Sequence, residues 1–339
     1  MSATPEDTPQ RFYAAACQTD FPAAETRADI SSRVDRMCEI VEQTVTGYEP
    51  FFDVRLLAFP EFAHAVPAYP TASELLEKLA IPVPNEHTER YHELAKRLGC
   101  YIQTGSFIEV DEAYPGHLFN TTVLIGPGGV LSRYRKVNPW IPWEVHSSPH
   151  DVPGYNENLF PVADTELGRI AVATCYDWLF PETIRELAFR GAEIMIRISA
   201  YMDPWGATEP MDWWTLINRT RALENMTYVI AANQGAEMRN YPPFSWPGGS
   251  MVVDYDGRIL AQADPGPGEK VVVAPIDLTT LRSERQRRLG HDTLAHSRSE
   301  MYEYLSAERL RSASGELSVE SLQQRIKDAK SRVPGRDGD

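Results

Sequence analysis

The chain has 339 residues, of which 42% are hydrophobic and 24% charged, a composition that is ordinary for a soluble globular protein. Its formal net charge of −15 argues against a nucleic-acid partner, because phosphate binding needs a clustered basic face. We expect no membrane partner either, because no stretch reaches the roughly 18 uncharged apolar residues that a span requires. The polar, acidic start MSATPEDTPQ lacks the pattern of a signal peptide, which predicts a cytoplasmic protein.

The four cysteines are Cys17, Cys38, Cys100 and Cys175. They form no CxxC pair, and their spacing matches no zinc signature. In a reducing compartment we expect free thiols, at least three of which serve as small buried hydrophobes.

The first half of the chain alternates short apolar runs with stretches of helical spacing. Proline and glycine mark where several of these elements stop, as Pro60 and Gly99 do. The predicted elements are a strand at 12–20, a helix at 30–45, a strand at 53–62, a helix at 87–99, extended chain at 101–110 and a hairpin at 118–137 around GPGG.

The second half continues the alternation and adds a hairpin with Asp-Gly at its turn. The predicted elements are a strand at 168–177, a helix at 181–192, a strand at 193–201, a helix at 211–225, a strand at 226–234, a hairpin at 250–263 and a strand at 270–278. Beyond residue 280 the chain is polar and charged, and we expect it to be helical or irregular.

This order predicts an α/β fold. Many strands are apolar throughout, which indicates a sheet covered on both faces. We expect a disordered N-terminus at 1–11, one α/β domain at 12–280, and a C-terminal extension at 281–339 whose end is disordered.

Three chemically complementary residues each follow an apparent core strand. Cys175 ends a strand, at the edge of the sheet where α/β proteins place ligands. Glu61 follows LLAFP, and an unpaired carboxylate is costly to bury. Lys136 follows the second strand of a hairpin. Taken singly, these residues are more typical of a packed thiol, a loop carboxylate and a basic surface patch shared with Arg133 and Arg135.

Together, the three groups are sufficient for acyl transfer. A thiol needs a base to become a nucleophilic thiolate. A carboxylate can serve as that base if burial raises its pKa. A fixed lysine supplies charge and hydrogen bonds to the oxyanion of a tetrahedral intermediate.

The chain resembles the nitrilase superfamily, the carbon–nitrogen hydrolases with a Glu–Lys–Cys triad. The resemblance rests on LLAFPEF, YRKVNPW and CYDWLFPE, which occur in the family's order and separation. RALENMTYVIAANQ and GGSMVVDYDGRILA extend it, so that it covers about residues 12 to 277. It implies a four-layer αββα sandwich and hydrolysis without a cofactor or metal.

The resemblance also implies roles for individual residues. Glu61 takes the thiol proton of Cys175, which attacks an amide carbonyl and forms a thioester. Lys136 and the backbone N–H of Tyr176 hold the oxyanion. Glu144, in NPWIPWEVH, corresponds to a second glutamate that positions the substrate nitrogen or the lysine.

YRKVNPWIPWE and MIRISAYMDP are most similar to the aliphatic amidase and formamidase branch. That branch implies a small primary carboxamide as substrate and a homodimer or larger homo-oligomer, with the tail beyond residue 280 contacting a partner subunit. The predicted substrate-binding residues, most of them forming aromatic walls, are Phe62, Trp140, Tyr176, Trp178 and Tyr201.

Other functions stay open at this point. The same fold supports an N-carbamoyl amine hydrolase or a nitrilase, and a glutaminase domain would need a separate synthetase. A non-catalytic binding protein is disfavoured by the intact triad.

Two further predictions concern charged side chains near the motifs. Arg197 lies on a strand that is expected to be buried, so we expect it to pair with a carboxylate such as Glu224 or Asp177. His146 and His150 have an HxxxH spacing, which alone does not predict a metal site.

Overall fold

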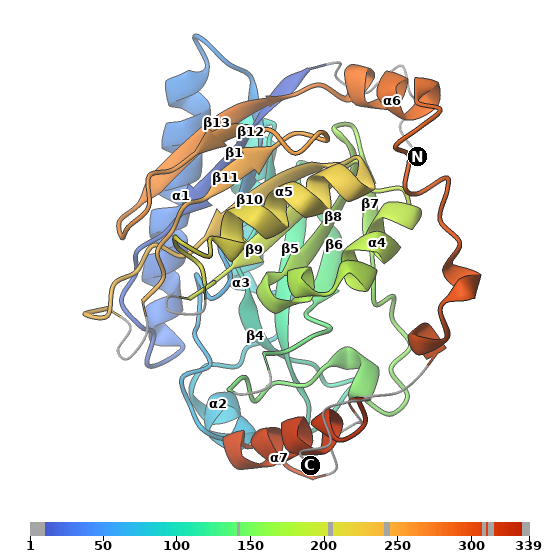
Figure 1. Cartoon of the computed structure of the whole chain (residues 1–339). Helices are drawn as coiled ribbons and strands as arrows, with labels where there is room; N and C mark the ends of the chain where they lie inside the picture. The colour runs from blue at the N-terminus through green and yellow to red at the C-terminus, as the bar shows by residue number, and fades with distance from the viewer. Residues whose placement is uncertain are drawn as a thin grey trace.

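Two β-sheets stack face to face between two layers of helices (Figure 1). The computed structural model describes residues 11–140, 143–202, 206–240, 245–306, 310 and 315–333. The predictions for residues 1–10 and for the last six residues of the tail lie outside these ranges.

The first sheet has the strand order β13-β1-β2-β3-β5-β4, and β6 pairs with β5. Its strands are β1 (Phe12–Gln18), β2 (Val54–Ala58), β3 (Tyr101–Gln103), β4 (Phe107–Val110), β5 (Leu118–Gly126), β6 (Gly129–Arg135) and β13 (Lys270–Ile276).

The second sheet has the order β12-β11-β10-β9-β8-β7, with β8, β9 and β10 parallel. Its strands are β7 (Val162–Thr165), β8 (Gly168–Thr174), β9 (Ile194–Ser199), β10 (Tyr228–Asn233), β11 (Met251–Val253) and β12 (Ile259–Gln262).

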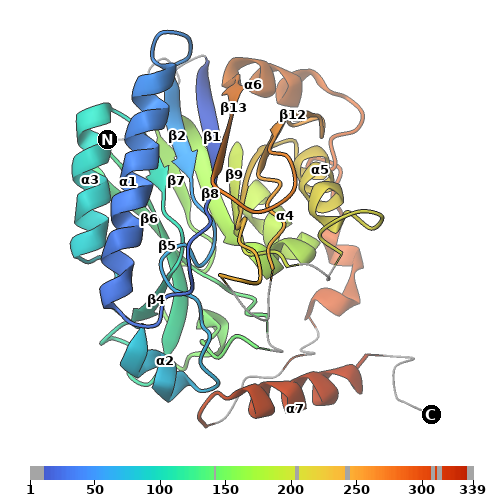
Figure 2. The same cartoon turned by 90° about the vertical axis from the view of Figure 1, so that its left-hand side faces the viewer.

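Helices cover the outer face of each sheet, as Figure 2 shows. The first sheet carries α1 (Ala28–Tyr48) and α3 (Glu86–Leu98), and the second carries α4 (Pro181–Phe189) and α5 (Trp213–Asn225). This arrangement confirms the predicted four-layer αββα sandwich. None of the helices among the described residues has both the length and the apolar character of a membrane span.

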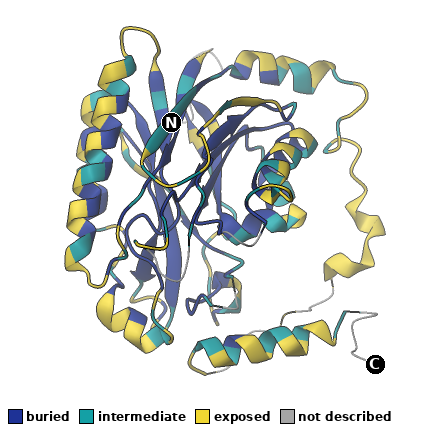
Figure 3. Ribbon diagram, turned by 60° about the vertical axis from the view of Figure 1, so that its left-hand side comes forward, coloured by how far each residue is buried: buried dark blue, intermediate teal, exposed yellow. Residues whose placement is uncertain are grey.

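The alternation of side chains in β1 shows why the sheets are covered on both faces. Ala15 and Cys17 belong to the apolar cluster that includes Val34 of α1, whereas Ala14 and Ala16 belong to the cluster between the sheets. Successive side chains of a strand point to opposite faces. Both faces of β1 are therefore buried, and most strands of the two sheets are dark in Figure 3, while the helices expose one side.

Several predicted strands end earlier than their apolar runs. The run at 168–177 leaves the sheet after Thr174, where the short 3₁₀ helix η2 (Cys175–Leu179) begins. The run at 53–62 leaves it after Ala58, two residues before Pro60. The short helix α2 (Ala72–Lys78) and strand β7 are absent from the sequence-based prediction.

The C-terminal tail folds back on its own chain. It contains α6 (Leu278–Arg287), which spans the expected boundary at residue 280, and α7 (Val319–Lys330), which lies beside α2 (Figure 1). Leu322 of α7 is buried with Leu75 and Leu79. Between these helices, Leu289 and Met301 are exposed. The contact of this tail with a partner subunit stays a prediction.

Two glycines offer a matched test of the end of α3. Gly99 has a left-handed φ of +65°, whereas Gly47 lies in α1, and a Cβ would meet nothing within 4 Å at either position. Gly99→Ala should lower the free energy of unfolding by about 1 kcal/mol, because a Cβ strains left-handed backbone. Gly47→Ala should raise it by roughly 0.5–1 kcal/mol. Urea unfolding measures both, and a Gly99→Ala variant as stable as wild type contradicts this geometry.

Candidate active site

Glu61 lies at the interface between the two sheets. The chain leaves β2 at Ala58, and the turn that follows buries the Glu61 side chain completely. Its Oε1 accepts hydrogen bonds from Lys136 Nζ at 2.7 Å and Asn120 Nδ2 at 2.9 Å. Its Oε2 accepts one from the backbone N–H of Ala200, just beyond β9, at 3.1 Å. Groups from both sheets therefore fix this carboxylate.

Lys136 is the first residue after β6, and its side chain is fully buried. Its ammonium lies between Glu61 Oε1 and both oxygens of Glu144, which are 2.8 and 2.9 Å from Nζ. Burial alone would lower the pKa of Lys136, but the charges of Glu144 and Glu61 raise it well above its ordinary value. Lys136 therefore stays an ammonium.

Glu144 completes the charged cluster. Besides Lys136, its Oε2 accepts hydrogen bonds from the backbone N–H of Trp140 at 2.8 Å and from His146 Nε2 at 2.9 Å. Burial by itself raises the pKa of Glu144, but Lys136 and His146 outweigh that effect and hold the pKa at about 2. Glu144 is therefore a carboxylate at neutral pH.

Cys175 lies directly after β8 in a strained turn. Its φ of +46° is left-handed, which costs a residue other than glycine about 1–3 kcal/mol. The Asp177 carboxylate secures this turn by accepting hydrogen bonds from Thr174 N at 2.9 Å, Asn138 N at 2.8 Å and the Tyr134 hydroxyl at 2.7 Å. The turn thus places the buried Cys175 thiol directly after the last residue of β8.

The thiol of Cys175 is protonated at rest. Burial and the charge of Glu61 raise its pKa to about 12, although Lys136 opposes them. Burial also raises the pKa of Glu61, and so does the charge of Glu144, while Lys136 and a hydrogen bond with Cys175 lower it. A protonated thiol therefore lies beside a carboxyl group with an unusually high affinity for protons.

Four of the five predicted substrate-binding residues lie in three places. Phe62 and Trp140 share one apolar cluster, and the Phe62 ring centroid lies 6.0 Å from Lys136 Nζ. Tyr201 lies 5.1 Å from the guanidinium of Arg197. Tyr176 has its ring against Phe180, where both residues line a separate cavity.

Trp178 lies entirely inside the core. Its residue exposure is 0%, and its indole N–H donates to the Ala173 carbonyl at 2.9 Å. Trp178 therefore supports the turn that carries Cys175, and its predicted contact with substrate gains no support from this placement.

The prediction of a carboxylate partner for Arg197 is wrong. Its Nη1 donates to Asn218 Oδ1 at 2.9 Å, and its guanidinium lies 4.4 Å from the Trp214 ring centroid. Glu224 pairs instead with Arg221 at 2.8 Å. The aromatic faces around Arg197 provide the cation–π contacts that a fully buried guanidinium favours.

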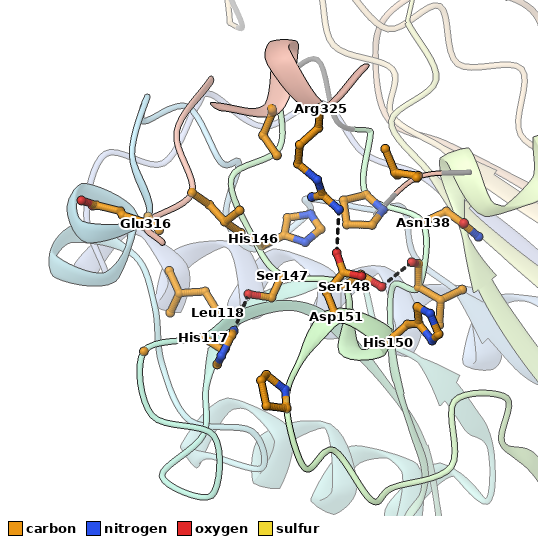
Figure 4. A pocket seen from close by; sticks show the side chains of 18 of the residues that line it. His117, Leu118, Asn138, His146, Ser147, Ser148, His150, Asp151, Glu316 and Arg325 are labelled. Carbon is orange, nitrogen blue, oxygen red and sulfur yellow. Dashed lines mark hydrogen bonds and ion pairs between the residues drawn. The ribbon is translucent and has the colours of Figure 1, made fainter. Parts of the chain in front are cut away.

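A cavity of about 1060 Å³ lies beside the charged cluster, under the C-terminal tail (Figure 4). His146, Asn138 and Tyr176 line it, and so does Arg325 of α7. Its lining among the described residues does not include Glu61, Lys136 or Cys175. It is therefore separate from the charged cluster, which it touches through His146.

Sequence reasoning missed two residues of the cluster, Asn120 and His146. Asn120 lies on the fully buried strand β5, so a polar residue within an apolar run was an available signal. The HxxxH spacing of His146 raises only the question of a metal ligand, yet His146 bonds to Glu144 two residues earlier.

One group of side chains among the described residues is close enough together to share a metal ion. It consists of Glu89, His92 and Glu93 on α3. These residues are at the surface or half-buried, and exposed acidic groups of this kind are common without an ion.

Comparison with known proteins identifies the family. The family model for carbon–nitrogen hydrolase matches residues 13–286. The chain belongs to the carbon–nitrogen hydrolase family. A formamidase from Bacillus cereus (strain B4264) is 32% identical over 265 residues, which are 77% of this chain and 72% of that protein. A formamidase from Bacillus thuringiensis (strain Al Hakam) is 31% identical over 265 residues, which again are 77% of this chain and 72% of that protein.

Solved structures show the same fold. The nitrilase-superfamily protein Nit3 from Saccharomyces cerevisiae superimposes with a TM-score of 0.67 at 24% identity, covering 86% of this chain and 98% of that one. An amidase from Nesterenkonia sp. gives 0.61 at 21% identity, covering 87% and 96%. These comparisons confirm the predicted superfamily and the kinship with formamidases. The chain is thus a hydrolase of carbon–nitrogen bonds other than peptide bonds.

Asp177→Asn tests the turn at Cys175. Both carboxylate oxygens of Asp177 accept hydrogen bonds from backbone N–H groups. In asparagine, an NH₂ group replaces one of these oxygens and would face one of these N–H donors. The free energy of unfolding should fall by about 1–3 kcal/mol, and a thiol reagent should alkylate Cys175 more slowly. The exposed Asp164→Asn serves as the control and should change neither quantity. If Asp177→Asn keeps the wild-type free energy of unfolding and the wild-type rate of Cys175 alkylation, Asp177 does not hold this turn.

Proposed function

We propose that this enzyme hydrolyses small primary carboxamides to a carboxylic acid and ammonia through a thioester on Cys175. The observation that carries the proposal is the buried Lys136 ammonium, held between Glu61 and Glu144 beside a protonated thiol. The similarity to formamidases supports the same class of substrate.

In the first half of the reaction, Glu61 accepts the proton of the Cys175 thiol, and the sulfur attacks the amide carbonyl carbon. Negative charge then develops on the carbonyl oxygen. Lys136 Nζ and the backbone N–H of Tyr176 donate to this oxyanion, since a first-turn N–H of η2 has no carbonyl of its own helix to bond. Glu61 passes its proton to the nitrogen, the carbon–nitrogen bond breaks, and ammonia leaves.

In the second half, Glu61 removes a proton from water, which attacks the thioester carbonyl. The same two donors hold the second oxyanion. The carbon–sulfur bond then breaks, the acid leaves, and the proton held by Glu61 returns to the Cys175 sulfur. Glu144 stays ionised throughout and acts by fixing the Lys136 ammonium.

The enclosure of the site favours a short acyl group. Cys175 is 9% exposed and Phe62 is 5% exposed, so both side chains are almost completely shielded from solvent. One extra methylene that a pocket does not accommodate makes a substrate worse than its shorter analogue by about 1–3 kcal/mol of transition-state binding. We therefore infer that formamide and acetamide are better substrates than longer or aromatic amides.

Ammonia release from a panel of compounds tests this proposal. The panel holds formamide, acetamide, propionamide, an aromatic amide, a dicarboxylate monoamide, an N-carbamoyl amine and a nitrile. We expect release from the short amides to decline with chain length and to vanish in Cys175→Ala, which should keep its fold by circular dichroism. Release from the carbamoyl compound or the nitrile alone, or turnover that survives in Cys175→Ala, would refute the proposal.

The pH dependence of kcat/KM tests the role of Glu61. The carboxylate accepts the thiol proton only when it is ionised, so activity should fall as Glu61 becomes protonated. Because the pKa of Glu61 is raised, this loss should be centred above the ordinary glutamate value of 4.5. Glu144 stays ionised across that range because its pKa is about 2. A loss centred at or below the ordinary value would contradict Glu61 as the base.

A further inference from the structure

His146 is a buried histidine to which neither the family resemblance nor the proposed reaction gives a role. It is 1% exposed, and its Nε2 lies 2.9 Å from Glu144 Oε2. Because Glu144 is ionised and can only accept hydrogen bonds, Nε2 must carry the hydrogen. His146 therefore donates to the carboxylate that holds Lys136.

This bond helps to fix the direction of the Glu144 carboxylate. Oε2 receives three donors, the Lys136 ammonium, the Trp140 backbone N–H and His146 Nε2, at 2.8 to 2.9 Å. Without His146, Oε2 loses one of its three donors, so the carboxylate is held less firmly and can rotate more easily. Rotation would draw the ammonium away from Glu61, which lies 2.7 Å from it.

We propose that His146 is a positioning residue, which acts through Glu144 to hold Lys136 where an oxyanion would form. The proposal rests on the proposed function, because the oxyanion belongs to that reaction. His146 has no place at the reacting atoms, so its loss should lower kcat and leave KM nearly unchanged.

The cavity beside His146 makes the proposal testable by chemical rescue. His146 lines the cavity of about 1060 Å³ together with Ser147 and Ser148, and Figure 4 shows the imidazole ring among these side chains. The cavity is partly open to solvent. Nδ1 of His146 has no hydrogen-bond partner among the described residues. Removing the ring would leave a space, continuous with the cavity, into which free imidazole fits and donates to Glu144.

The experiment compares His146→Ala, His146→Gln and a control from the same cavity. The control is His117→Ala, because His117 lines the cavity but bonds to Ser147 at 3.0 Å rather than to Glu144. We expect kcat for a short amide to fall by about 10- to 100-fold in His146→Ala. This range is typical of the loss of a hydrogen bond that orients a side chain bound to a metal ion, and His146 orients Glu144 in the same way.

Added imidazole should restore much of this kcat in His146→Ala and none in Cys175→Ala. His146→Gln, which keeps an N–H donor, should keep more activity than His146→Ala. His117→Ala should match wild type. A wild-type kcat in His146→Ala would overturn the proposal. A loss of kcat that imidazole does not restore, and that is accompanied by a lower melting temperature, would show that His146 only packs in the core.

A second measurement separates this proposal from the proposed function. If the wild type releases no ammonia from any amide, the proposed function fails. The rate at which iodoacetamide alkylates Cys175 then tests His146 without turnover. We expect slower alkylation in His146→Ala and recovery with imidazole, because Lys136 also fixes the proton acceptor Glu61. Equal alkylation rates in wild type and His146→Ala would overturn the role of His146.

Discussion

The burial of the Lys136 ammonium between two carboxylates is the constraint on which the site depends. An unpaired buried charge costs several kcal/mol, and removing one partner of a buried pair typically costs about 3–5 kcal/mol. Lys136, Glu61 and Glu144 are therefore stable inside the protein only as a set. Glu61 also accepts the N–H of Ala200, from the second sheet. The stacking of the two sheets is thus what assembles the site.

The first sheet carries the charged residues Glu61 and Lys136, whereas the second sheet carries Cys175 in a strained backbone conformation. Cys175 takes up a left-handed backbone immediately after β8, and the buried Asp177 secures the turn with bonds to Thr174 and Asn138. Burial keeps the thiol protonated, so the resting protein holds no reactive thiolate. In the proposed reaction the proton moves only to Glu61, which burial has already made a better acceptor.

The sequence predicts the positions of Glu61, Lys136 and Cys175 well, because the ends of apolar runs are visible in local patterns. The fold class follows from the same patterns and from the family motifs. Contacts between distant segments are not visible in this way. Asn120 meets Glu61 across 59 residues of chain, and α7 returns to α2 from the far end of the tail. Arg197 is an example. Its burial predicts that the guanidinium has partners, but the sequence does not show that these partners are an amide and aromatic rings.

In the proposed reaction, an acyl group passes through the sulfur of Cys175. Mass spectrometry of protein quenched in acid during turnover of a short amide tests it most directly. We expect an added mass equal to the acyl group, located on the peptide that contains Cys175 and lost when hydroxylamine cleaves the thioester. Steady turnover with no adduct on Cys175, or with an adduct on another residue, would rule out the thioester on Cys175.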